Sequence, residues 1–142
     1  MTTPKLTAAD YPLAEKRPDL VVGKRGKILD AITLDGLLSG EVTLEDLSIT
    51  KRALNQQAEI ARNVGRTTLA QNFERAADIV EVPQETIMRI YELLRPGRAD
   101  SKDQLLAVAS ELQATYGAAK MAAFIVEAAD IYERRELFKK RY

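Results

Sequence analysis

The sequence predicts an all-α fold in which an irregular, extended N-terminal arm precedes a compact bundle of about five main helices. Three observations support this prediction. Apolar residues recur at intervals of three and four in five stretches after Thr50. No stretch alternates apolar and polar residues for long enough to predict a β-strand. Pro4, Pro12 and Pro18 lie close together near the start of the chain, where they prevent a long helix.

The predicted arm, residues 1–32, combines helix-breaking residues with apolar side chains. The apolar members are Tyr11, Leu13, Leu20, Val21, Val22, Ile28 and Leu29. Apolar residues on an extended segment need a surface to cover them. Two alternatives are equally supported: the arm folds back on its own helices, or it docks on another chain. In the second case Tyr11, Pro12 and Leu13 are the candidate contact residues.

The predicted helical domain, residues 33–142, opens with two short helical turns. Thr33 is a typical N-cap, and Gly40 can end the first turn. Thr43 precedes Glu45 and Asp46, which places two acids where the helix dipole favours negative charge.

Five longer helices follow, each delimited by residues that start or stop helices. They are expected over about 51–64, 66–80, 84–95, 102–116 and 118–139. Gly65, Pro83, the Pro96-Gly97 pair and Gly117 separate them. Ser101 and Gln104 have the spacing of a capping box, in which each side chain satisfies a backbone N–H.

The charge balance argues against nucleic-acid and membrane partners. Lysine plus arginine number 21 and aspartate plus glutamate also number 21, so the net charge is zero. A nucleic-acid binder normally carries a basic surplus, and a peripheral membrane protein benefits from one. A small chain without net charge has little repulsion between copies and suits a place inside a complex.

Three absences in the sequence bear on the cellular location of the chain. No apolar run approaches the roughly 18 residues that a membrane span needs. The first ten residues contain no hydrophobic stretch that could act as a secretory signal. The absence of cysteine fits a reducing cytoplasm. A cytoplasmic location is therefore expected.

The chain contains neither histidine nor cysteine. This excludes Ser-His triads, cysteine nucleophiles and the usual zinc and iron–sulfur sites. We therefore expect no catalytic, cofactor-binding or metal-binding residue in this chain. An enzyme that works with carboxylates is the remaining catalytic alternative, and Glu127 and Asp130 are its candidates. Arg134 lies four residues beyond Asp130, so an ion pair along the helix is the preferred interpretation.

Residues 56–75 could form a helix-turn-helix with Gly65 in the turn. The second helix would offer Arg66 and Arg75 to DNA, but Glu74 would face phosphates unfavourably. An antiparallel helix pair explains the pattern without DNA. A stand-alone DNA-binding regulator is kept as the alternative function.

Arg95 and Arg98 flank the Pro96-Gly97 pair at a predicted helix end. Arginines at that position complement the negative end of the helix dipole. They could also form bidentate contacts with carboxylates of a partner protein. Both residues are therefore candidate interface residues.

Several stretches resemble the small subunit of adenosylcobalamin-dependent glycerol and propanediol dehydratases. They are DYPLA (10–14), LSGEVT (38–43), NFERAA (72–77), IYELLRP (90–96), LLAVA (105–109), AAF (122–124), EAA (127–129) and Tyr132. No single stretch is diagnostic, but their order is consistent and they cover nearly the whole chain from Asp10 onward.

The resemblance implies a non-catalytic subunit that stabilises a dehydratase complex. The small chain would contact a large TIM-barrel subunit that carries the active site. Adenosylcobalamin would lie between the large and medium subunits, in a dimer of three-chain units. The complex would convert glycerol or 1,2-propanediol to the corresponding aldehyde by radical dehydration.

Propanediol dehydratase small subunits commonly carry an extension before the DYPLA element that is associated with microcompartments. Here that element begins at Asp10. This favours a cytoplasmic glycerol dehydratase over a microcompartment enzyme.

Overall fold

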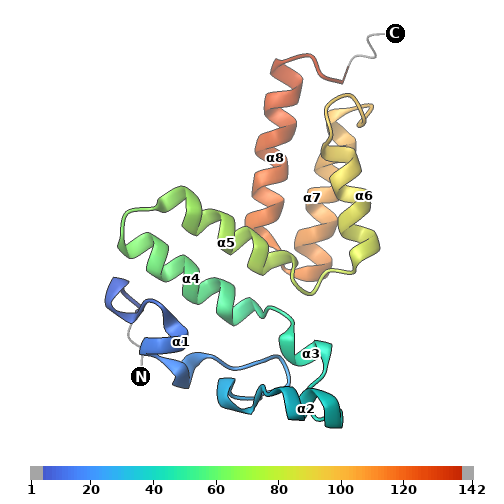
Figure 1. Cartoon of the computed structure of the whole chain (residues 1–142). Helices are drawn as coiled ribbons and strands as arrows, with labels where there is room; N and C mark the ends of the chain where they lie inside the picture. The colour runs from blue at the N-terminus through green and yellow to red at the C-terminus, as the bar shows by residue number, and fades with distance from the viewer. Residues whose placement is uncertain (1–4, 139–142) are drawn as a thin grey trace. The chain divides into compact units, whose positions relative to one another are not determined.

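The computed structural model describes residues 5–138, and helices dominate this part of the chain (Figure 1). The all-α prediction is confirmed. The chain forms two compact units that divide between Ala77 and Asp78. This division falls within a helix, whereas the sequence placed the end of an arm at residue 32. That residues 1–32 act as a separate arm stays a prediction.

The first unit contains short helical turns followed by two longer helices. Its 3₁₀ turns are η1 (Ala8–Asp10), η2 (Pro18–Leu20) and η3 (Leu29–Ala31), and its α-helices are α1 (Leu13–Lys16), α2 (Leu34–Ser39), α3 (Leu44–Leu47), α4 (Lys51–Asn63) and most of α5 (Thr67–Ile79). The second unit contains α6 (Gln84–Leu94), α7 (Lys102–Tyr116) and α8 (Ala119–Arg134).

Residues 6–13 fold back on α4 in short helical turns. Leu6 and Leu13 are buried together with Ile60 of α4. The Leu6 N–H donates to Glu59 Oε2 at 3.0 Å, and the Ala8 N–H donates to Asn63 Oδ1 at 3.0 Å. Burying these two leucines is favourable because it removes apolar surface from water, whereas a fully extended segment would leave that surface exposed. The sequence left open whether this region packs on its own helices or docks on another chain. The structure shows packing on its own helix α4.

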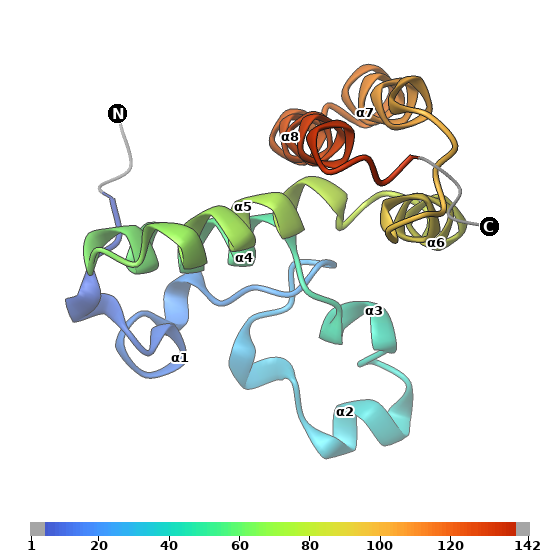
Figure 2. The same cartoon turned by 90° about the horizontal axis from the view of Figure 1, so that it is seen from above.

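Helices α4 and α5 run side by side in opposite directions (Figures 1 and 2). The Thr50 hydroxyl accepts from the Ala53 N–H at 3.1 Å at the start of α4. Gly65 adopts a φ of 76° in the turn, a conformation that favours glycine. Between the helices, Phe73 packs against buried alanines at positions 58, 61 and 70. The antiparallel pair was the preferred interpretation of this stretch.

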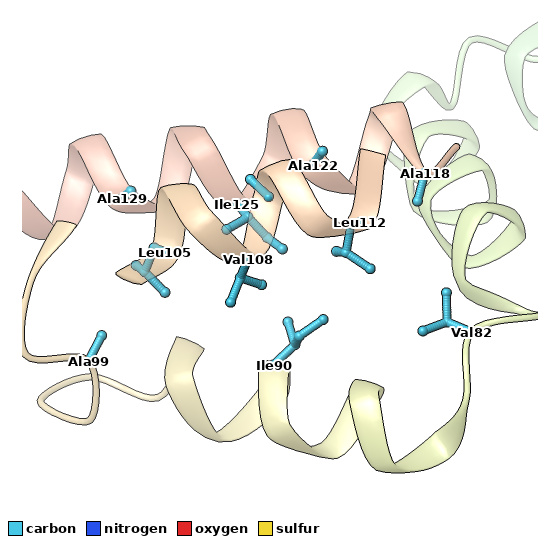
Figure 3. Packing of buried hydrophobic residues seen from close by; sticks show 11 residues of the cluster. Val82, Ile90, Ala99, Leu105, Val108, Leu112, Ala118, Ala122, Ile125 and Ala129 are labelled. Atoms are coloured by element: carbon cyan, nitrogen blue, oxygen red, sulfur yellow. The ribbon is translucent and has the colours of Figure 1, made fainter. Parts of the chain in front are cut away.

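The second unit has its own core, built by the apolar faces of three helices (Figure 3). Leu105 and Leu112 of α7 and Ile125 of α8 are its largest fully buried side chains. Small residues of α8, Ala122 and Ala129, lie in the same cluster and let α7 and α8 pack closely.

Two local predictions for these helices are wrong. Helix α8 ends at Arg134, not near Lys139, which itself lies outside the described residues. Ser101 makes no side-chain capping hydrogen bond, so no capping box forms. The Gln104 side chain instead accepts from the Asp100 N–H at 2.9 Å. The amide reaches one residue further back than a capping box requires.

Candidate partner-contact surfaces

Tyr11, Pro12 and Leu13 take three different environments. Tyr11 is 59% exposed, whereas Leu13 is only 6% exposed because it packs in the cluster with Leu6 and Ile60. Pro12 is half-buried between them. Tyr11 and part of Pro12 are therefore accessible at the surface, and the Leu13 side chain supports the fold of its own unit. The interface role of this element stays a prediction.

Two hollows flank Tyr11 on the first unit. One has a volume of about 380 Å³ and is lined by α1, the residues after it and the start of α4, including Leu20 and Val21. The other has a volume of about 580 Å³ and is lined mainly by α4 and α5, including Val64 and Phe73. Tyr11 lines both. The exposed aromatic ring thus lies between two largely apolar depressions, a surface suited to protein contact.

Arg95 and Arg98 share one carboxylate of their own chain. Arg95 Nη1 lies 3.0 Å from Glu92 Oε2, and Arg98 Nε lies 3.1 Å from Glu92 Oε1. All three side chains are about half exposed. The loop therefore keeps a surplus positive charge that remains accessible. Its predicted partner contact is untested.

Asp130, one of the two candidate carboxylates, forms an ion pair between helices. Asp130 Oδ1 lies 2.8 Å from Lys102 Nζ, which also lies 2.7 Å from Glu133 Oε2. The hydrogen bonds that Lys102 donates to Asp130 and Glu133 raise the pKa of Lys102 above its usual range. The expected pairing of Asp130 with Arg134 is replaced by a bond between helices. Within residues 5–138, no three acidic side chains gather in a way that could hold a metal ion.

Asp46 is buried in the structure, whereas its sequence position indicated only that it lies in the first turn of a short helix. Arg25 Nε donates to Asp46 Oδ1 at 2.9 Å, Arg25 Nη2 donates to Oδ2, and the Thr43 N–H donates to Oδ2 at 2.9 Å. The Arg25 bonds chiefly, helped by Thr43, lower the pKa of Asp46 to about 2. No local pattern links Arg25 to Asp46, so only the folded chain reveals the pair.

No helix within the described range is long and apolar enough to cross a membrane. The features that are present are an exposed aromatic, an arginine loop and structural ion pairs.

The chain belongs to the dehydratase small-subunit family, whose model matches residues 6–139. Two curated relatives are similar over most of this chain. The propanediol dehydratase small subunit of Citrobacter freundii is 47% identical over 137 residues, which cover 96% of this chain and 78% of that protein. The propanediol dehydratase small subunit of Salmonella typhimurium is 45% identical over 138 residues, covering 97% and 79% respectively. The family resemblance read from the sequence is confirmed, and the DNA-binding alternative has no support.

Proposed function

We propose that this chain is the non-catalytic small subunit of an adenosylcobalamin-dependent dehydratase that converts 1,2-propanediol or glycerol to the corresponding aldehyde. Its role is to dock on the large subunit and stabilise the assembly, a dimer of units that each contain a large, a medium and a small chain. The assembly acts in the bacterial cytoplasm.

The observation that carries this proposal is the similarity to two relatives named as propanediol dehydratase small subunits over nearly the whole chain. The chemistry of the chain is consistent with an accessory role. It has no histidine and no cysteine, and its carboxylates at positions 46 and 130 are engaged in ion pairs.

The cofactor belongs to the other subunits in this proposal. This chain has no imidazole that could coordinate cobalt. No described buried side-chain nitrogen or oxygen lacks a hydrogen-bond partner and waits for a ligand. We therefore assign the corrin to the other subunits and no step of the reaction to this chain.

Coexpression tests the proposal. The affinity-tagged chain is produced with the large and medium subunits encoded beside it, and the eluate is assayed for subunit stoichiometry and for turnover of both diols after addition of adenosylcobalamin. We expect equimolar recovery of the three chains and diol turnover. Recovery of the tagged chain alone, as a stable monomer, would contradict the proposal.

A further inference from the structure

One short segment of the first unit carries an unusual density of exposed aliphatic side chains. Of the fifteen large hydrophobic side chains that are exposed among residues 5–138, eight fall between residues 28 and 49. They are Ile28, Leu29, Leu34, Leu37, Leu38, Leu44, Leu47 and Ile49. We call residues 28–49 the aliphatic segment. Scattered exposed leucines are ordinary in proteins, but a concentration of this kind marks an interaction surface.

The spacing within α2 and α3 places these leucines in stripes. Leu34, Leu37 and Leu38 are three and four residues apart and so share one side of α2. Leu44 and Leu47 share one side of α3 in the same way. Leu38 and Leu44 are 77% and 82% exposed. Both stripes therefore face away from the interior of their own unit.

The interior of the segment is small and largely polar. Gly36, Val42 and Asp46 are its only buried residues. The Val42 N–H donates to the Gly36 carbonyl at 2.9 Å, and the Thr33 hydroxyl accepts from the Gly36 N–H at 3.0 Å. The backbone is thus held by hydrogen bonds, and the leucines contribute little to holding it.

Arg25 anchors this arrangement from outside the segment. Besides its bonds to Asp46, its Nη2 donates to the Glu41 carbonyl at 2.7 Å. One guanidinium thereby ties the bend between α2 and α3 to the first turn of α3. A surface held in shape before binding loses less entropy when a partner arrives.

The charges of the aliphatic segment are all of one sign. It contains five acidic residues and no lysine or arginine. Asp46 is neutralised by Arg25, and Glu45 lies 3.9 Å from Lys24. Asp30, Asp35 and Glu41 form no ion pair with another described residue. Within residues 28–49, three carboxylates therefore remain available to meet a basic partner.

This combination restricts what can cover the segment. Neither of the two hollows beside Tyr11 is lined by its residues, so these hollows do not make it a small-molecule site. Anionic lipid headgroups would be repelled by the acids. A symmetric contact between two copies would bring acid against acid. A protein with an apolar face and a basic rim fits both features.

We propose that the aliphatic segment is the principal docking surface for the large dehydratase subunit, whose facing surface is apolar and rimmed by lysine or arginine. This inference rests on the proposed function and adds the surface to it. It is independent of the Tyr11 element and the arginine loop, which the sequence suggested as contacts.

The absence of cysteine allows a direct test. Leu38→Cys introduces the only thiol of the chain, and its labelling by a fluorescent maleimide is followed on the small-subunit band. Glu85→Cys, on the exposed start of α6, is the matched control. We expect labelling of residue 38 to slow by roughly tenfold or more when the full complex forms, because water is excluded from an interface core. Unchanged labelling at residue 38 in a verified complex would overturn the inference.

A charge-introducing variant tests the energetic weight of the surface. Leu38→Lys together with Leu44→Lys is expected to weaken association with the large subunit by about 100-fold or more. Met88→Lys, an equally drastic change at an exposed residue of α6, is the control. Far-UV circular dichroism of each full-length variant verifies folding.

The outcomes separate the two proposals. If the unmodified chain does not copurify with the large subunit, the proposed function fails. If the unmodified chain and the double variant copurify equally well, only the docking surface is wrong. Loss of binding to the medium subunit alone, or loss of self-association alone, would likewise overturn the assignment to the large subunit.

Discussion

Arg25 and Asp46 form a two-bond ion pair between an exposed loop and a wholly buried carboxylate. The Asp46 side chain is 0% exposed, whereas the Arg25 side chain is 39% exposed. Gly23 lies against the same residue: a Cβ at position 23 would come within 2.8 Å of the Asp46 carbonyl oxygen. The ion pair and the close backbone approach together fix residues 23–46 without a large hydrophobic core.

The Asp46 pair predicts a pH dependence of stability. Its folded-state pKa is about 2, below the ordinary value of 3.8, so between these values the unfolded chain binds more protons than the folded one. The stability that the pair contributes is complete above about pH 5 and is lost as pH falls through 4 towards 2. Urea unfolding from pH 7 to pH 2.5 measures it.

Asp46→Asn is the matched variant, because it keeps an oxygen acceptor for the Thr43 N–H. We expect it to be less stable at pH 7 and to show a smaller loss of stability on acidification. Asp10 and Asp19 also have lowered pKa values, through Thr7 and Arg17 respectively, so some acid dependence remains. Identical slopes for the two proteins would show that Asp46 does not titrate as described.

Gly36→Ala should destabilise the first unit although it replaces a helical glycine. The new Cβ would lie 2.9 Å from Val42 Cγ2 and 3.1 Å from Thr33 Oγ1. Overpacking of this kind costs about 1–3 kcal/mol, more than the roughly 0.5–1 kcal/mol that alanine normally gains over glycine in a helix. Val42→Ala removes the closest atom, so the double variant should recover part of the loss. A Gly36→Ala protein that is more stable than the unmodified chain would refute this packing.

Asp78 caps a helix that is distant in sequence. Its Oδ2 accepts from the Lys120 N–H at 2.8 Å and the Met121 N–H at 3.1 Å, 42 and 43 residues away. Asp78→Ala should lower the free energy of unfolding of the second unit by about 1 kcal/mol. Asp78→Asn retains an acceptor and should cost less. Equal stability of the alanine variant and the unmodified chain would show that the cap is dispensable.

The same substitution at two leucines should have very different effects on the free energy of unfolding. Leu112 is 1% exposed in the core of the second unit, whereas Leu38 is 77% exposed. Leu112→Ala should lower the free energy of unfolding of the isolated chain by about 2–5 kcal/mol. Leu38→Ala should change it by no more than about 0.5 kcal/mol. A large loss for Leu38→Ala would mean that the aliphatic segment supports the fold of its own chain.

The sequence predicted the features that depend on neighbouring residues. Thr33 accepts from the Gly36 N–H, and Gly40 ends α2 with a φ of 81°, as their residue types indicated. The boundaries of α4 and α6 also follow from their flanking residues. Each of these features is determined within one or two helical turns.

Contacts between distant residues could not be predicted in this way. Arg25 and Asp46 are 21 residues apart, and the Asp78 cap reaches 42 residues along the chain. The outward orientation of the α2 leucines was missed as well. The spacing of Leu34, Leu37 and Leu38 in α2 gave no local indication of it, because apolar residues three and four apart are equally typical of a helix face that packs into its own core.

The central claim is that this chain contributes contact surface and no reactive group to the dehydratase. The most direct measurement is the kcat for diol dehydration of the cofactor-loaded complex that carries Glu127→Gln and Asp130→Asn in this chain. We predict an unchanged kcat, because Asp130 is bonded to Lys102 and the proposed function places the active site in the large subunit. A large fall in kcat in an intact complex would contradict the account.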